Sequence, residues 1–241
     1  MGEVIRVGLD TSKHVFQVHG VDRSEHVVLS RQLSRGQVEK YFAALAPTVV
    51  GLEACGASHY WARVLRELGH QVRLLPPQYV KPYVKRGKND RIDAEAICEA
   101  MSRPSMRFVP VKSADEQAAA MLLSVRDLLV KQRTMLVNAI RSHAAEFGVI
   151  GAKGVGRIAD VLERARESVP KLAWDLLSIL AGQLEVTEVQ LAHTDKRLKA
   201  WHRESERSQR LATIPGVGPI GAMTMVLRVP DPTVFRSGRH F

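Results

Sequence analysis

The patterns typical of β-strands are confined to the first 75 residues of this 241-residue chain. Segments 4–10, 14–21 and 26–31 alternate apolar and other residues, and the short polar link DRSE between the last two indicates antiparallel neighbours. Two short apolar strands follow at 48–53 and 71–75, each separated from the preceding strand by a helical pattern. Three early strands followed by alternating helix and strand predict a mixed α/β sheet.

The rest of the chain carries helical patterns. Segment 113–147 contains neither proline nor glycine, and its apolar residues recur at three- and four-residue spacing, as in a helical hairpin or a coiled coil. A second long amphipathic segment spans 171–206, after a glycine-rich break at 147–157. A helix at 90–102 and a proline-containing linker at 103–112 connect the predicted sheet to these long helices.

The composition favours a polyanionic partner. The formal net charge is +10 and the isoelectric point about 9.9, which favours nucleic acid over a membrane, with a basic but unrelated enzyme as the alternative. Cys55 and Cys98 belong to no CxxC pair, so we expect neither a zinc site nor a disulfide framework, and a reduced cytoplasmic setting fits. The sequence shows no signal pattern and no apolar run as long as a membrane span, so we expect no membrane association.

Carboxylates stand at the ends of several predicted elements. Asp10 closes the first strand in GLDTSK, and Glu53 closes the fourth in VGLEACG. Asp90 and Asp93 lie three residues apart at the start of a predicted helix, so they share one helix face. The alternative for each aspartate is a turn former or a helix cap. Glu53 fits that alternative poorly, because an unpaired charge among apolar neighbours is costly.

Four converging carboxylates would repel one another, and burial would raise their pKa values. One or two Mg²⁺ ions would relieve that repulsion, because Mg²⁺ prefers oxygen ligands. Two such ions can align an attacking and a leaving oxygen at a phosphodiester. Basic residues for binding phosphate lie just before or among Asp90 and Asp93: Lys81, Lys85, Arg86, Lys88 and Arg91.

Long stretches of the chain resemble the insertion-sequence transposases of the IS110 family, to which the Piv-type DNA invertases are related. The resemblance lies in GLDTSKHVFQVHG, in GLEACGASHYWARVLRELGHQVRLLPPQYVKPYVKRGKNDRIDAEAI and in RTMLVNAIRSHAAEFG. It implies an N-terminal domain of RNase-H/RuvC-like fold whose DEDD set is Asp10, Glu53, Asp90 and Asp93, with Mg²⁺ as cofactor.

The resemblance continues in RLATIPGVGPIGAMTMVLRVPDPTVFRSGRHF, where IPGVGP resembles a helix-hairpin-helix signature. Gly216 and Gly218 would allow a tight turn whose backbone N–H groups contact a phosphate, and a plain turn between packed helices is the alternative. The implied organisation is a RuvC-like domain at 1–112, a long-helix region at 113–206 and the start of a transposase domain at 207–241.

The family's proposed nucleophilic serine lies beyond Phe241 in longer members, and Ser237 does not match it. We therefore expect a chain that lacks this serine. The resemblance further implies DNA as substrate, a guide RNA encoded by the element, a homodimer or homotetramer, and a bacterial cytoplasmic, nucleoid-associated location. The long helices would contact either another subunit or each other.

Two other functions stay open. A stand-alone RuvC-like metal-dependent nuclease would need only the DEDD domain, and metal-dependent cleavage by this chain alone would reveal it. A non-catalytic nucleic-acid-binding remnant would bind without cleavage. The helix-hairpin-helix signature favours the transposase family, since a simple nuclease of this type lacks it.

Overall fold

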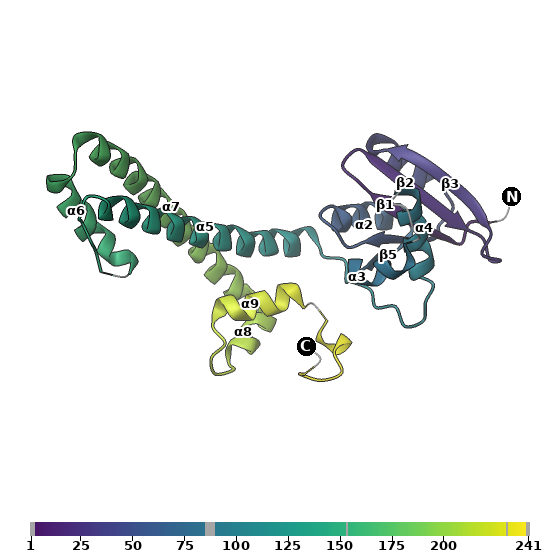
Figure 1. The fold of residues 1–241 in the computed structure, drawn as a ribbon. Helices are drawn as coiled ribbons and strands as arrows, with labels where there is room; N and C mark the ends of the chain where they lie inside the picture. Colours follow the sequence, from purple (N-terminus) through teal and green to yellow (C-terminus); the bar gives the residue numbers. More distant parts are fainter. Residues whose placement is uncertain (1–2, 85–89, 153, 230, 240–241) are drawn as a thin grey trace. The chain divides into compact units, whose positions relative to one another are not determined.

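The protein is described by a computed structural model covering residues 3–84, 90–152, 154–229 and 231–239 (Figure 1). It divides into two compact units, Met1–Asp115 together with Asp231–Phe241, and Glu116–Pro230. Each unit has its own hydrophobic core. Among the described residues, no helix is both long and apolar enough to cross a membrane.

The first unit is built on a five-stranded sheet with the strand order β3-β2-β1-β4-β5. Its strands are β1 (Arg6–Thr11), β2 (Val15–Val21), β3 (Val27–Ser34), β4 (Val49–Glu53) and β5 (Gln71–Leu75). The β1–β2 and β2–β3 pairs are antiparallel, whereas β4 runs parallel to β1 and β5 parallel to β4. The mixed α/β sheet predicted from the sequence is therefore confirmed.

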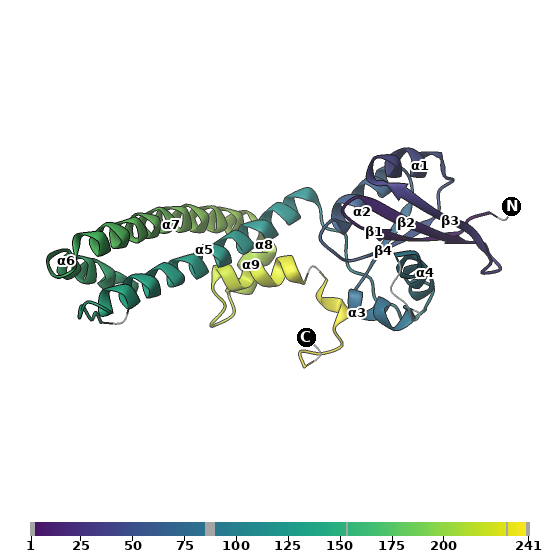
Figure 2. The same ribbon diagram turned by 45° about the horizontal axis from the view of Figure 1, so that its top comes forward.

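Successive side chains of each strand point to opposite faces of the sheet, and both faces are covered by helices. On one face, Leu9 of β1 and Leu52 of β4 pack against α1 (Val38–Ala44) and α2 (Ser58–Glu67). The other face is covered by α4 (Asp90–Ala100). Figure 2 shows α1 and α2 on one side of the sheet and α4 on the other.

The helix α4 lies in direct backbone contact with the sheet, and two glycines make room for it. A Cβ atom on Gly8 of β1 would lie 2.0 Å from the carbonyl oxygen of Ala94 and 2.6 Å from the backbone nitrogen of Cys98. A Cβ atom on Gly51 of β4 would lie 2.6 Å from the sulfur of Met101. No side chain larger than hydrogen fits at Gly8 unless the helix shifts.

Shorter elements follow β5. They are α3 (Pro77–Val80) and the 3₁₀ turn η2 (Lys81–Tyr83), which both contact α4. After α4 the chain returns to the sheet, where the Val109 N–H donates to the Leu74 carbonyl of β5 over 2.8 Å. The other 3₁₀ turns are η1 (Arg35–Gln37), η3 (Val155–Arg157) and η4 (Pro232–Val234).

The second unit is helical. Its helices are α5 (Ala114–Ala145), which begins just before the unit, α6 (Ile158–Ser168), α7 (Lys171–Glu204), α8 (Glu206–Ala212) and α9 (Pro219–Arg228). Segment 113–147 thus contains one unbroken helix, so the segment does not itself form a helical hairpin.

The helices α5 and α7 run antiparallel and pack on each other within one chain. Near one end, Ile140 of α5 shares a core with Leu177 of α7 and with α6. Toward the other end, Leu123 of α5 packs with Leu198 of α7 and with α9. An ion pair between Arg126 Nε and Asp195 Oδ1, at 2.6 Å, lies between these two cores.

We predict that Gly8→Ala destabilises the protein by about 1–3 kcal/mol, because the added methyl group must displace the α4 backbone. The matched control is Gly36→Ala, where a Cβ atom meets nothing within 4 Å, and it should change stability by less than about 0.5 kcal/mol. Urea denaturation of the three proteins measures both effects. Equal denaturation midpoints for Gly8→Ala and wild type would contradict the close approach of α4.

Candidate metal centre

Asp10 and Glu53 lie side by side at one edge of the sheet. The parallel register pairs Leu9 with Leu52, so Asp10 and Glu53 occupy the next position on each strand. Each carboxylate stands two residues after one of the glycines that contact α4. Because side chains alternate between the faces of a strand, both carboxylates are on the α4 side of the sheet.

The two segments that follow these carboxylates are joined to each other. The Thr11 hydroxyl lies 3.4 Å from the Cys55 thiol, which links the end of β1 to the loop after β4. The buried Ser58 hydroxyl donates to the Cys55 carbonyl over 2.9 Å and accepts from the Cys55 N–H over 3.2 Å. The Ala54 N–H donates to the Leu75 carbonyl of β5 over 2.8 Å. These contacts fix the backbone on the C-terminal side of Glu53.

The third carboxylate comes from the first turn of α4. Asp93 precedes Ala94, whose carbonyl group meets β1 at Gly8. Partial burial raises the pKa of Glu53 above its ordinary value, and the negative charge of Asp93 raises it further. Glu53 and Asp93 are therefore close enough to repel each other when both are ionised.

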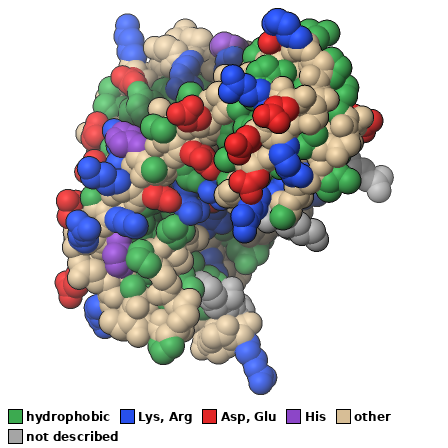
Figure 3. Space-filling view, turned by 90° about the vertical axis from the view of Figure 1, so that its left-hand side faces the viewer, with side chains coloured by type: hydrophobic (Ala, Val, Ile, Leu, Met, Phe, Trp, Pro, Cys, Tyr) green, Lys and Arg blue, Asp and Glu red, His purple; other side chains and the backbone are tan. Residues whose placement is uncertain are grey.

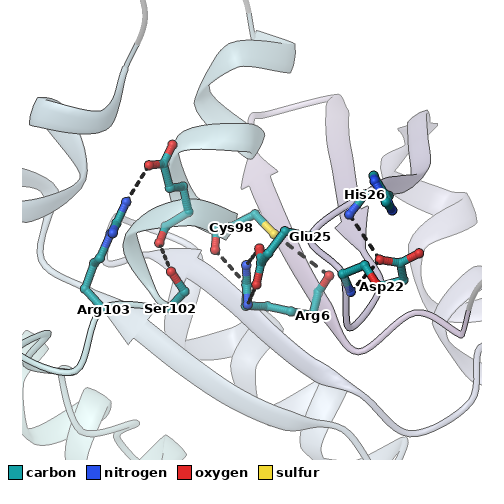
Figure 4. Close-up of polar contacts among 9 residues, drawn as sticks. Arg6, Asp22, Glu25, His26, Cys98, Ser102 and Arg103 are labelled. Atoms are coloured by element: carbon teal, nitrogen blue, oxygen red, sulfur yellow. Dashed lines mark hydrogen bonds and ion pairs between the residues drawn. The ribbon is translucent and has the colours of Figure 1, made fainter.

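A polar cluster holds the other end of α4 (Figure 4). Arg6, at the start of β1, donates from Nε to the Cys98 carbonyl over 2.9 Å. The same guanidinium forms an ion pair with Glu25, in the turn between β2 and β3. Arg6 thus connects the helix, the central strand and the β2–β3 turn, which fixes α4 along the sheet and so positions Asp93.

The structure brings Glu53 and Asp93 together and places Asp10 next to Glu53 in register. The Asp90 side chain lies outside the described residues, although its backbone begins α4. Within the described part of the chain, no group of three or more His, Cys, Asp or Glu side chains is arranged to hold a metal ion. The four-carboxylate site therefore stays a prediction. The donors present fit a divalent cation, because they are carboxylate oxygens whose mutual repulsion a cation would relieve.

The predicted nucleic-acid-binding residues fall into three groups. Lys81 on η2 and Arg91 on α4 are exposed and lie on elements that contact each other. Lys85, Arg86 and Lys88 lie outside the described residues. In the helical unit, Gly216 has a φ of 86° in the turn between α8 and α9, and Gly218 is the N-cap residue of α9.

Two positions that matter for this site, Gly8 and Gly51, were missed by reasoning about carboxylates alone. The signal was present, because the same pattern of glycine, leucine and acid ends both parallel strands, as Gly8-Leu9-Asp10 and Gly51-Leu52-Glu53. A repeat of small, apolar and acidic residues on neighbouring strands indicates a close helix on one face and a carboxylate on that same face.

Comparison with known families gives two matches to this chain. A family of transposases with the DEDD motif, of IS110 type, matches residues 7–148. The transposase family IS116/IS110/IS902 matches residues 208–241. The first match contains Asp10, Glu53, Asp90 and Asp93, and the second contains Gly216 and Gly218.

Similar proteins come from several bacteria. A protein of Sinorhizobium fredii that carries a transposase assignment is 53% identical over 99% of this chain, and the chain spans 62% of its length. The transposase for insertion sequence element IS1328 of Yersinia enterocolitica is 37% identical over 100% of the chain, which spans 72% of that protein. The transposase for IS1111A of Coxiella burnetii is 38% identical, and the chain spans 67% of it.

We predict that Glu53→Gln stabilises the metal-free protein at neutral pH. Well below its ordinary pKa of 4.5, Glu53 is protonated in the folded and unfolded states alike, so the variant and wild type should be equally stable. As the pH rises through the raised folded-state pKa, ionised Glu53 destabilises the wild type, and the variant gains relative stability. Urea midpoints between about pH 4 and pH 8 measure this difference.

The control is Glu39→Gln, which changes an exposed carboxyl group on α1 in the same way. It should show no comparable gain with pH. A Glu53→Gln variant that loses stability as the pH rises would mean that Glu53 is stabilised by a positive partner and does not face another carboxylate.

Proposed function

Because the chain belongs to the IS110-type family of insertion-sequence transposases, we propose that it is part of an enzyme that cuts and rejoins DNA at the ends of a mobile element. The observation that carries the proposal is the closeness of Glu53 and Asp93, with Asp10 at the neighbouring strand end in register with Glu53. Carboxylates held together against their own repulsion are typical of a metal-dependent phosphoryl-transfer site.

In this proposal, Asp10, Glu53, Asp90 and Asp93 hold one or two Mg²⁺ ions. A bound ion supplies positive charge that stabilises the charge developing on the scissile phosphate. The chain's own residues position the carboxylates: Gly8 admits α4 to the sheet, and Arg6 fixes its far end. Lys81, Arg91 and the neighbouring Lys85, Arg86 and Lys88 would bind the nucleic-acid backbone.

The partners in this proposal are the element's DNA ends, target DNA and a guide RNA encoded by the element, acting in the bacterial cytoplasm beside the nucleoid. The net charge of +10 supports a polyanionic partner. Gly216 and Gly218 are exposed, and the Val217 N–H between them donates to the Ile214 carbonyl over 3.0 Å, so a phosphate at this turn would be met by the N–H groups of the two glycines. A helix-hairpin-helix role for α8, α9 and this turn is part of the proposal.

The attacking hydroxyl group would come from a serine outside residues 1–241, and Ser237 is assigned no role. The proposed domains are a RuvC-like domain at 1–112, a long-helix region at 113–206 and the start of a transposase domain at 207–241. A stand-alone metal-dependent nuclease is a second candidate, because Asp10, Glu53 and Asp93 all belong to the first compact unit.

We also propose that the chain forms a homodimer or homotetramer through its long helices. Along α7, Leu177, Leu184, Leu191 and Leu198 repeat every seven residues and are buried within the chain. A second row with the same repeat stays exposed on α7 at Leu172, Ile179 and Val186, and α5 exposes a similar row at Met121, Leu128 and Met135.

These exposed rows are strongly apolar. Ile179 is 63% exposed and Leu128 is 54% exposed. On the face drawn in Figure 3, hydrophobic side chains reach the surface between acidic and basic ones. Seven-residue apolar repeats on two antiparallel helices are typical of helices that pack against further helices. A second copy of the chain exposes the same two apolar rows, so the rows of two copies could pack against each other.

The metal site is tested by Mg²⁺ titration calorimetry on wild type, Asp10→Asn and the control Asp127→Asn. Asp127 is exposed on α5, so its variant has the same change in charge outside the site. We expect Asp10→Asn to weaken Mg²⁺ binding at least about tenfold, since removal of a ligand costs no less than removal of a group that only supports one. Unchanged affinity in Asp10→Asn would overturn the DEDD assignment.

The oligomer is tested by light scattering on wild type, Leu128→Glu, Ile179→Glu and the control Ala159→Glu. Wild type should have a mass that is a multiple of the 26.8 kDa chain. A charge on either exposed row should shift the mass toward the monomer, whereas Ala159 is exposed on α6, outside both rows, and should tolerate the charge. A monomeric wild-type protein would contradict this prediction.

A further inference from the structure

A pocket of about 420 Å³ lies in the first unit, beside the strand that neighbours Glu53. Two segments line it. Tyr79, Pro82 and Tyr83 follow β5, and Ser105, Met106 and Arg107 precede Val109, which bridges to Leu74 of β5. Its volume falls within the range of about 300–1,000 Å³ that small ligands occupy in proteins.

The register of the sheet places this pocket at the same edge as the carboxylates. Glu53 pairs with Leu75, the last residue of β5, and the pocket residues begin four positions later at Tyr79. The returning segment reaches the same end of β5, because Val109 bonds to Leu74 and the chain runs antiparallel there. The pocket is therefore next to the strand end that carries Glu53, on the β5 side.

The aromatic side chains of the pocket differ in how they are held. The Arg103 guanidinium lies over the Tyr83 ring, 5.5 Å from its centroid, which fixes that ring in place. The Tyr79 side chain is 43% exposed, and no aromatic ring or guanidinium of the described residues stacks on it. An exposed aromatic ring at the wall of a pocket offers a free π-face to a planar ligand.

The charge around the pocket suits a nucleotide. Arg107 forms part of the wall, and the exposed Lys81 lies between Tyr79 and Tyr83 in sequence. Apolar contacts from Pro82 and Met106 complete a surface for a flat ring. An aromatic platform beside cationic side chains is the combination by which proteins bind single-stranded nucleic acid.

We propose that this pocket receives one unpaired nucleobase, stacked on Tyr79, of the nucleic acid whose backbone reaches the carboxylate centre. The inference rests on the proposed function and adds to it a site for a base next to the site for the phosphate. The base must be unpaired, because a base inside a duplex has both faces covered by its neighbours and reaches a protein pocket only when unstacked. DNA and RNA share this chemistry, and the ring alone does not distinguish them.

The test measures dissociation constants of the 241-residue chain by fluorescence anisotropy at one fixed salt concentration. The probes are a single-stranded DNA, a single-stranded RNA and a duplex DNA of the same sequence, each fluorescein-labelled. The variants are Tyr79→Phe, which keeps the ring, and Tyr79→Leu, which removes it. The matched control is Tyr60→Leu, since Tyr60 is 44% exposed and is not a lining residue of this pocket.

We expect Tyr79→Leu to bind a single strand roughly tenfold more weakly, as for the loss of one base–aromatic stack, with duplex binding unchanged. Tyr79→Phe and Tyr60→Leu should bind single strands as wild type does. A loss confined to the DNA or the RNA strand identifies which nucleic acid supplies the base. Circular dichroism of each variant confirms that it is folded.

Two results would overturn the inference. Wild-type affinity of Tyr79→Leu for both single strands would show that no base stacks there, and an equal loss in Tyr79→Phe would show that the hydroxyl group acts in place of the ring. If wild type binds nucleic acid and Tyr79→Leu is unaffected, the pocket inference alone fails. If wild type binds none of the probes, the proposed nucleic-acid function fails with it.

Discussion

The close approach of α4 to the sheet is the constraint on which the candidate site depends. Helix and strand meet at Gly8, where even a methyl group would overlap the Ala94 carbonyl. This contact sets the distance between α4 and β1, and the adjacent Asp93 is close enough to Glu53 for its charge to act on that carboxyl group. With a larger residue at Gly8 the sheet could keep its hydrogen bonds, but α4 and the Asp93 that it carries would have to shift.

Glu53 and Asp93 repel each other when both carboxyl groups are ionised. Burial and the charge of Asp93 both raise the pKa of Glu53, so at neutral pH its ionised form works against the folded state. The contacts that oppose this repulsion lie elsewhere: Arg6 bonds to Cys98 at the far end of α4, and Ser58 holds the loop after Glu53. In the proposed function, a bound cation would relieve this repulsion.

Local patterns predicted much of the fold. Alternating residues predicted the first three strands and short apolar runs the other two. Asp10 and Glu53 were correctly expected at strand ends, because each closes one of these apolar segments. The closeness of Asp93 to Glu53 could not be derived from the sequence, because helix spacing fixes which residues share a face but not which strand that face meets. The role of Gly8 depends on its packing against Ala94 and Cys98, more than 80 positions away, and the periodicity of a sequence cannot predict such a contact.

The helical unit shows a different limit of sequence reasoning. A seven-residue apolar repeat indicates that a helix packs against another helix, but the repeat is the same whether the partner belongs to the same chain or to a second copy. The helix α7 has two such rows. Leu177 and Leu184 are buried within the chain, whereas Ile179 and Val186 are exposed. Only the structure separates the row that is already paired from the row that is not.

The topology of the sheet explains why the functional features gather at one edge. β1, β4 and β5 are parallel, so their C-terminal ends lie together, whereas β2 runs the opposite way and presents its N-terminal end there. Asp10 and Glu53 occupy the ends of the first two of these strands, and Tyr79 follows the end of the third. In the proposed function, a nucleic acid bound at the carboxylates would pass neighbouring strand ends toward the Tyr79 pocket. The ion pair between Arg6 of β1 and Glu25 of the β2–β3 turn lies at the opposite end of β1, where Arg6 also bonds to α4.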